Sequence, residues 1–481
     1  MVTLQRTLAA ALPLLLTLAF AAGTSAQQAA KKRRNVLFLI SDDLGAQSLA
    51  CYGNQQCKTP AIDALAARGA RFTRAYCQFP VCGPSRAALM SGMYPQAIGV
   101  MGNGQARRFT KNLGDRPSMA GLFKRNGWRS TRVSKIFHMR VPGDITKGVH
   151  GPDHAASWSE RFSFRAPEWM TEGEHAHYTR EKLKFDRDKH YNLGFGGAFY
   201  VVRGKSDGAE QADMLAADKA IEVLRKQHDK PFFLAVGFVR PHVPLVAPAA
   251  YYEPYPQGEV ELPSQLDGDW ADIPKLGISK NSKRSGLTSA KEKRQVLGAY
   301  YASVAFMDAQ VGRILKALDD LGLRDDTLVV FTSDHGYHLG EHEFWQKMSL
   351  HEESTRIPLI VAGPGIDAAT TNSLAQQIDI YPTLAELAGL SVPAHVQGKS
   401  LVPVLRRRAV KVHDDVYCTK RNGHLIRTEH HAYLSWQDGT AELYDMDRDP
   451  LQFTNLVKEE THAAVVKEMS KRLEARLASF K

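Results

Sequence analysis

The chain has 481 residues, 43% of them hydrophobic, which is enough to bury the core of one large domain and a smaller one. Its 62 Lys and Arg residues outnumber its 51 Asp and Glu residues, so the formal net charge is +11. Because no nucleic-acid-binding motif accompanies this charge, the composition predicts no nucleic-acid partner and favours another polyanionic one.

The first 26 residues have the pattern of an export signal. Arg6 is followed by an uncharged, mostly apolar run at residues 8–22 and then by the small residues Thr24, Ser25 and Ala26. This order is typical of a cleaved secretory signal peptide, and a retained membrane anchor is the alternative. We predict an exported protein, periplasmic or secreted, with a basic tail at 27–34 and no stable membrane span after signal cleavage.

Residues 35–41 form a continuous apolar run, which predicts a strand buried on both faces of a parallel sheet. Asp42 and Asp43 follow it directly. Two adjacent carboxylates repel each other unless a cation lies between them, and open α/β sheets bind ligands where their strands end. The pair is therefore a candidate metal site, with a surface turn as the alternative.

The stretch from Cys82 to Gly92 predicts a helix. Pro84 suits its first turn, and Gly92 suits the position just past its end. The free N–H groups at such a helix start, with Arg86 one turn in, favour an oxyanion beside Cys82. The alternative is that Cys82 is a buried apolar residue or half of a disulfide.

Three later predicted strands also lead into charged or imidazole side chains. These strands and the residues after them are 128–134 with Lys135 and His138, 231–238 with His242, and 326–333 with Asp334 and His335. Taken singly, such residues could be surface polar groups or, for the proline-flanked His242, part of a rigid turn. Because ligands bind at the carboxyl ends of strands in open α/β sheets, we expect Asp334 and His335 to complete one site with the aspartate pair.

Helical periodicity at 211–227 and 292–320 alternates with buried strands. This rhythm is typical of an α/β fold with a large, mostly parallel central sheet. Shorter helices are predicted at 58–69, 118–127 and 379–390. Residues 143–207 show little periodicity, so we expect long loops there that surround the cleft and choose the substrate.

The pattern changes beyond residue 408. Four short strands are predicted at 415–419, 424–428, 432–436 and 442–445, followed by a helix at 460–480. We therefore predict a catalytic domain at 35–410 and a C-terminal α+β subdomain with a small antiparallel sheet at 411–481.

Two further patterns have competing interpretations. His338 and His342 could bind zinc as a pair, but no H-E-x-x-H arrangement surrounds them, and loop structure is favoured. Cys51 and Cys57 could form a disulfide across a short loop or remain two free buried thiols.

The string from Cys82 to Gly92 matches C-x-P-S-R-x-x-x-[LM]-[ST]-G at every fixed position. On this motif and the strand-end residues, the chain resembles the type I sulfatases of the alkaline-phosphatase-like superfamily. The resemblance implies that a formylglycine-generating or equivalent maturation enzyme oxidises Cys82 to formylglycine. One oxygen of the hydrated aldehyde would attack the sulfur of a sulfate ester, and the other would expel sulfate.

The resemblance also implies a metal. One Ca²⁺, with Mg²⁺ the less expected ion, would be held by the modified Cys82 together with Asp42, Asp43, Asp334 and His335. Hard oxygen ligands suit both ions, and an imidazole is tolerable although less usual for calcium.

The remaining candidates take their roles from the same resemblance. Arg86, Lys135 and Lys347 would position the nucleophile and the sulfate. His138 would assist the proton transfers of the hydrate, and either His242 or Lys347 would protonate the leaving oxygen.

Ser134 to His138, Val239 to Pro244 and the Asp334-His335 pair look most like iduronate-2-sulfatase and its bacterial relatives, although many members have glycine where this chain has Ser134. This likeness predicts a sulfated saccharide substrate, most specifically the 2-O-sulfate of a terminal uronic acid. The alternatives are a phosphonate monoester or phosphodiester hydrolase of the same superfamily and a non-catalytic glycan-binding relative.

Overall fold

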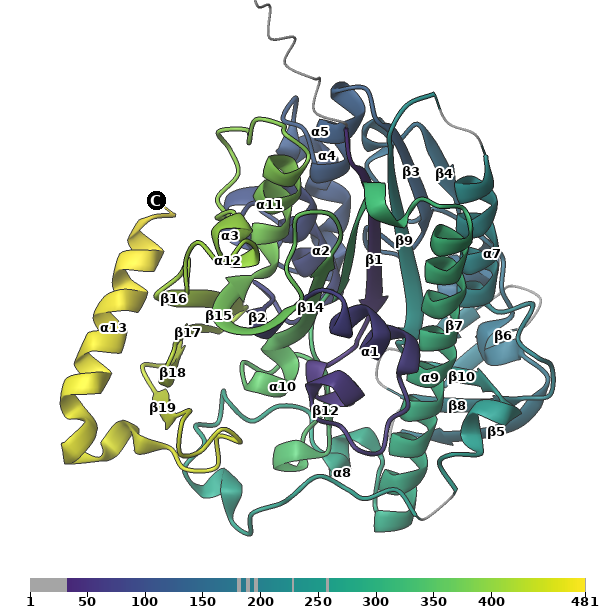
Figure 1. Cartoon of the computed structure of the whole chain (residues 1–481). Coiled ribbons are helices and arrows are strands. Elements are labelled where there is room, and N and C mark those ends of the chain that lie inside the picture. Colours follow the sequence, from purple (N-terminus) through teal and green to yellow (C-terminus); the bar gives the residue numbers. More distant parts are fainter. Residues whose placement is uncertain are drawn as a thin grey trace, which may run out of the picture. The chain divides into compact units, whose positions relative to one another are not determined.

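Eight strands form the central sheet of the computed structural model (Figure 1). In spatial order they are β15 (Ala369–Gln376), β2 (Ala70–Tyr76), β14 (Arg356–Ala362), β11 (Thr327–Ser333), β1 (Asn35–Asp42), β9 (Phe232–Pro241), β3 (Arg129–Ser134) and β4 (Glu160–Phe162). β14 is antiparallel to both neighbours and the other paired strands are parallel, which confirms the predicted mostly parallel sheet. The structure describes residues 33–179, 183–186, 191–193, 198–226, 229–256 and 259–480.

Side chains alternate between two hydrophobic clusters along β1. Val36, Phe38 and Ile40 pack into one cluster, Leu37 and Leu39 pack into the other, and all five are fully buried. The first cluster includes α2 (Cys82–Ser91), α5 (Met119–Arg125) and α11 (Ile380–Leu387). The second includes α1 (Pro60–Ala67), α7 (Ala212–Arg225) and α9 (Ala290–Asp320), so helices cover both faces of the sheet (Figure 1).

Local sequence signals set the helix ends. The Ser289 hydroxyl accepts a hydrogen bond from the Glu292 N–H, and the Glu292 carboxylate accepts one from the Ser289 N–H, which together cap α9. Gly92 follows α2 with φ +68°, a conformation that glycine adopts without strain. The predicted helices are confirmed, with ends that differ by a few residues.

The long loops expected at residues 143–207 are interrupted by short helices and strands that were not predicted. This region contains α6 (Gly143–Lys147), the main-sheet strand β4, and β5 (Gly173–Tyr178) and β8 (Phe199–Gly204), which pair with β10 (Leu245–Pro248) in a three-stranded sheet. It also contains the paired strands β6 (Lys184–Asp186) and β7 (Tyr191–Leu193). The strands are short, and β10 lies beyond the region itself, so local periodicity gave little sign of them.

A separate four-stranded sheet follows at the C-terminal end. Its strands are β16 (Asp415–Lys420), β17 (Gly423–Thr428), β18 (His431–Trp436) and β19 (Ala441–Asp445), and α13 (Ala463–Ala478) packs on it. These elements match the predicted α+β unit, while the domain boundary after residue 410 stays a prediction. Residues 1–32, with the predicted signal peptide, lie outside the described residues. Within the described part, no helix is long and apolar enough to cross a membrane.

Candidate active site

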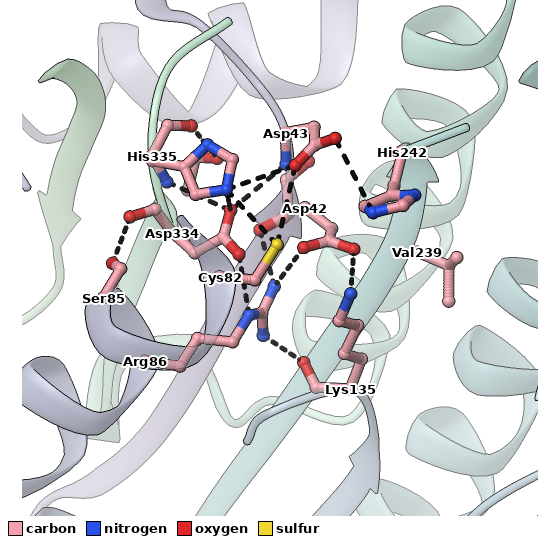
Figure 2. A network of polar contacts seen from close by, with 12 residues as sticks. Asp42, Asp43, Cys82, Ser85, Arg86, Lys135, Val239, His242, Asp334 and His335 are labelled. Carbon is pink, nitrogen blue, oxygen red and sulfur yellow. Dashed lines mark hydrogen bonds and ion pairs between the residues drawn. The ribbon is translucent and has the colours of Figure 1, made fainter. Parts of the chain in front are cut away.

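Four adjacent strands, β11, β1, β9 and β3, end at the candidate site (Figure 2). Asp42 is the last residue of β1 and, after a shift in register, pairs with Pro241 of β9, which directly precedes His242. Asp334 and His335 follow β11, and Lys135 follows β3. The structure thus brings together side chains that are up to about three hundred residues apart in the chain, because parallel neighbours end at the same edge.

α2 begins at Cys82 and carries it into this cluster. Cys82 is 1% exposed, and its sulfur lies 3.3 Å from His335 Nε2, 3.4 Å from Lys347 Nζ and 3.8 Å from Asp43 Oδ1. Burial raises the pKa of the thiol well above its ordinary value, although Lys347 opposes the shift. The unmodified thiol is therefore protonated at neutral pH, which makes it a weak nucleophile.

Arg86 connects the carboxylates of two strands. Its Nε donates to Asp334 Oδ2 over 2.8 Å, and its Nη2 lies 3.1 Å from Asp42 Oδ1. The same guanidinium donates through Nη1 to the Lys135 carbonyl oxygen over 2.5 Å. Because the arginine and both aspartates are fully buried, this geometry fixes the ends of β1, β3 and β11 relative to the start of α2.

Two lysines add positive charge beside the aspartate pair. Lys135 Nζ donates to Asp42 Oδ2, and Lys347 Nζ lies 2.6 and 2.9 Å from the two oxygens of Asp43. Burial alone would raise the pKa of Asp42, but Lys135, His242 and Arg86 together lower it well below its ordinary value. The pKa of Asp43 is likewise lowered, against burial, by His242 and Lys347. Both carboxylates are therefore anionic at neutral pH.

The buried acids offer a set of metal ligands. Oxygens of Asp42, Asp43 and Asp334 lie within 4.8 Å of one another, and so do ligand atoms of Asp43, Cys82 and His335. Burial raises the pKa of Asp334, with Asp42 adding to it and Arg86 opposing. Three converging carboxylates with an imidazole at their edge fit a divalent cation that prefers oxygen ligands.

Two histidines border the cluster. His242 Nε2 lies 3.8 Å from Asp43 Oδ2, and its Nδ1 donates to the Val243 carbonyl oxygen over 2.6 Å. Burial lowers the pKa of His242 to about 4. Burial and then Lys135 hold the pKa of His138 well below its ordinary value. His138 Nδ1 is buried and has no hydrogen-bond partner among the described residues, so it remains available to a ligand.

Three residues at the site were not singled out from the sequence. Ser85 donates to Gln377 Oε1 over 2.7 Å, and Gln377 Nε2 donates to the Asp334 carbonyl oxygen over 3.0 Å. The Tyr300 hydroxyl donates to the Asp43 carbonyl oxygen over 2.7 Å. Ser85 lies within the motif and could have been found there, whereas Gln377 and Tyr300 lie in segments whose pattern indicated only packing.

The other candidates lie away from this cluster. His338 and His342 are buried, and His342 Nδ1 lies 2.9 Å from Asp269 Oδ2, so they belong to a packed loop region as favoured above. The groups of possible metal ligands found in the described part of the chain all contain Asp42 or Asp43. Cys51 and Cys57 are free thiols, which is the second of the two alternatives considered.

Residues 34–390 match the Sulfatase family, and residues 340–479 match the family described as N-sulphoglucosamine sulphohydrolase, C-terminal. The chain is 33% identical over 441 residues to a sulfatase of Formosa agariphila, covering 88% of this chain and 82% of that protein. It is 29% identical over 518 residues to iduronate 2-sulfatase of Homo sapiens, covering 88% of this chain and 90% of that protein.

The fold is shared with solved structures. The phosphonate monoester hydrolase of Agrobacterium radiobacter is 24% identical, with a TM-score of 0.75 and coverage of 93% of this chain and 96% of that chain. At this identity the likeness concerns the fold alone, which is alkaline-phosphatase-like as predicted. Because the Sulfatase match spans residues 34–390 and the Formosa relative is one-third identical over most of the chain, this protein belongs to the sulfatase family and is a sulfuric ester hydrolase.

Proposed function

We propose that this sulfatase hydrolyses a sulfate ester of an acidic saccharide through a formylglycine that a maturation enzyme makes from Cys82. The position of Cys82 carries the proposal: its sulfur lies within 3.3 to 3.8 Å of His335, Lys347 and Asp43. A nucleophile placed there lies beside a lysine, an imidazole and a buried carboxylate.

Asp42, Asp43, Asp334 and His335 would hold one Ca²⁺, together with the modified Cys82. A bound divalent cation supplies positive charge where a sulfate monoester accumulates negative charge. Mg²⁺ prefers oxygen ligands as well and is the less favoured ion, because it tolerates fewer departures from octahedral geometry than Ca²⁺ does.

Other side chains of this protein would position the reacting groups and transfer protons. Arg86 would hold the metal-binding acids and the α2 start in place, while Lys135 and Lys347 would orient the sulfate. His138 would exchange protons with the hydrated aldehyde. His242 or Lys347 would give a proton to the leaving oxygen, since both lie beside Asp43. Because burial lowers the pKa of His242 to about 4, this histidine would take that role only once the negative charge of a bound substrate raises its pKa.

The substrate we propose is a 2-O-sulfated terminal uronic acid, and the predicted export signal is consistent with a glycan outside the cytoplasm. One relative is named iduronate 2-sulfatase, and the basic composition suits an acidic saccharide. The phosphonate monoester hydrolase with the same fold keeps a phosphonate ester as the second candidate substrate.

Mass spectrometry and turnover of purified enzyme test the proposal. The peptide that contains Cys82 should be lighter than its cysteine form by about 18 mass units, as expected for the aldehyde. Turnover should be fastest on 2-O-sulfated uronate disaccharides, compared with N- or 6-O-sulfated glucosamine, an aryl sulfate and a phosphonate monoester. Full activity with unmodified Cys82 would contradict the nucleophile, and preference for another ester would contradict the substrate.

A further inference from the structure

A cavity of about 390 Å³ is lined by Gly83 and Ala87 of α2 on one side and by the segment that carries His138 on the other. We call it the Arg107 cavity; its lining includes Gly83, Phe109, Phe137, His138, Arg140 and Arg107 itself. Its volume falls within the range of about 300 to 1,000 Å³ that ligand pockets occupy. Gly83 is the residue after Cys82, so the cavity begins next to the position where the ester would react.

The wall that carries Arg107 is attached to the nucleophile helix. The Gly83 N–H donates to Asn103 Oδ1 over 2.7 Å, and Asn103 starts the short helix η3 (Asn103–Arg108). A Cβ on Gly83 would lie 2.7 Å from Asn103 Oδ1 and 2.9 Å from its Cα, so only glycine permits this approach. The Gly83–Asn103 contact therefore holds the start of η3, the helix that carries Arg107, against the first turn of α2.

One charged side chain that lines the cavity has no partner of opposite charge among the described residues. Arg140 Nε and Nη2 lie 2.9 and 2.6 Å from Asp144 Oδ1, which neutralises that pair. The other lining acid, Asp153, faces Arg132 and Arg161 at 3.3 and 3.2 Å. Arg107 is exposed and has no hydrogen bond or ion pair with any residue in the described ranges. The cavity thus presents one free guanidinium.

The rest of the lining suits a sugar ring. Phe109 and Phe137 are buried, with ring centroids 4.9 Å apart, and offer apolar surface. His138 also lines the cavity, is 9% exposed, and has a buried Nδ1 with no hydrogen-bond partner among the described residues. Pockets with mostly apolar walls and a few placed polar groups are typical of small-molecule sites.

We propose that the Arg107 cavity binds the saccharide part of the substrate, and that Arg107 pairs with a second oxyanion on it, either a carboxylate or a further sulfate. Guanidinium groups bind both anions through two parallel hydrogen bonds. This proposal rests on the proposed function, since it takes the ester to react at Cys82. It assigns substrate recognition to η3, outside residues 143–207 where sequence periodicity placed it.

The test compares the selectivity of Arg107→Ala with that of Arg108→Ala, a neighbouring exposed arginine that does not line the cavity. Selectivity is kcat/KM on a sulfated uronate disaccharide divided by kcat/KM on an aryl sulfate that has no second anion. Arg107→Ala should lower this ratio about tenfold or more, the effect of losing a charged hydrogen bond, while Arg107→Lys should lower it less. Arg108→Ala should leave it unchanged.

Two further substrates identify the oxyanion. If the carboxylate is recognised, reducing it to an alcohol should remove the sensitivity to Arg107→Ala; if a sulfate is recognised, only a disaccharide with two sulfates should show that sensitivity. Equal ratios for Arg107→Ala and Arg108→Ala on all these substrates would overturn the proposal and leave the proposed function intact.

A binding measurement separates the two proposals further. Calorimetry on Cys82→Ala enzyme, with and without Arg107→Ala, should show weaker binding of the same disaccharides when the guanidinium is removed. If mature wild-type enzyme hydrolysed none of the sulfate esters, the proposed function would fail. Equal affinity with and without Arg107 would overturn the cavity assignment independently of turnover.

Discussion

Two buried clusters of acids and bases each include residues of the segment that follows β11, and they differ in what neutralises the acids. The catalytic cluster consists of Asp42, Asp43, Asp334, His335, Cys82, Arg86, Lys135 and Lys347. The imidazole cluster consists of His338, His342, His351, Asp269 and Glu442. In the first, each of the three aspartates faces an arginine or a lysine. In the second, His342 pairs with Asp269 and His351 with Glu442, at 2.9 and 3.1 Å.

This difference determines what each cluster can do. Arginine and lysine keep their charge across the working pH range. Against burial, cationic neighbours lower the pKa of Asp42 and of Asp43, so these two carboxylates remain anionic. An unperturbed imidazole titrates near pH 6.5, so its charge is not permanent. In the second cluster, His351 connects the segment after β11 to the C-terminal sheet through Glu442 of β19. Glu442 also accepts hydrogen bonds from Trp436 and Tyr444, at 2.7 and 2.6 Å, which is typical of a structural network.

The largest expected effect is a difference in turnover between variants of the catalytic cluster and a variant of the imidazole cluster. Asp42→Ala or Asp334→Ala should lower turnover by at least about 10³-fold, because each change removes a proposed metal ligand and leaves Arg86 without one of its partners. Thorough chelation of wild-type enzyme should have a similar effect. Asp269→Asn in the imidazole cluster serves as the control and should change turnover far less. Near-normal rates in Asp42→Ala or in chelated enzyme would show that the metal assignment is wrong.

Removing a buried cation should lower the free energy of unfolding more than removing a partly exposed one. Arg86→Met leaves Asp42 and Asp334 buried without their shared cation, which should lower the free energy of unfolding by about 3 to 5 kcal/mol. The matched change is Arg313→Met, whose ion pair with Asp218 is partly exposed and should contribute less than about 1 kcal/mol. Denaturant melts of both variants measure the difference, and equal losses would contradict it.

The contribution of the imidazole cluster to the free energy of unfolding should depend on pH. Hydrogen bonding to Asp269, with nearby Glu353 adding to it, outweighs burial and raises the pKa of His342. A raised folded-state pKa stabilises the fold below the unfolded value of about 6.5, and the contribution is lost as pH rises through the folded value.

His342→Gln should therefore cost about 1.5 to 3 kcal/mol at pH 6 and progressively less toward pH 9, as read from denaturant melts across that range. His430→Gln is the matched control, because His430 pairs with Asp447 at 2.6 Å but is mostly exposed. A cost for His342→Gln that grows with pH would reverse the assigned sign.

For Asp42, whose pKa is lowered, the stabilisation is instead lost as pH falls through the folded value.

The smallest expected effect concerns backbone strain beside Lys135. Ser134 has φ +58°, a region that costs a residue with a side chain about 1 kcal/mol. Ser134→Gly should therefore stabilise the protein by about this amount, measured as a rise in the unfolding midpoint. Ser130→Gly, in the same strand without positive φ, should destabilise it instead. A loss of stability in Ser134→Gly would show that its side chain contributes more than the strain costs.

Much of this molecule could be predicted from local patterns. The apolar run at 35–41, the capping signals of α9 and the motif at α2 each depend on residues a few positions apart, so their elements were found within a few residues of their observed ends. The strand-end position of Asp42, Lys135, His242 and Asp334 followed from the same reasoning. Their catalytic roles came from family resemblance and remain proposals.

Only the tertiary structure decided which groups neutralise one another. No periodicity in the sequence could show that Arg86 lies between Asp42 and Asp334, that Gln377 reaches the end of β11, or that β8 pairs with β10. Nor could it show that Arg107 borders the space beside Cys82. Helix and strand patterns report contacts within a few residues, whereas the charge state and chemistry of a buried site depend on neighbours that packing brings from distant parts of the chain.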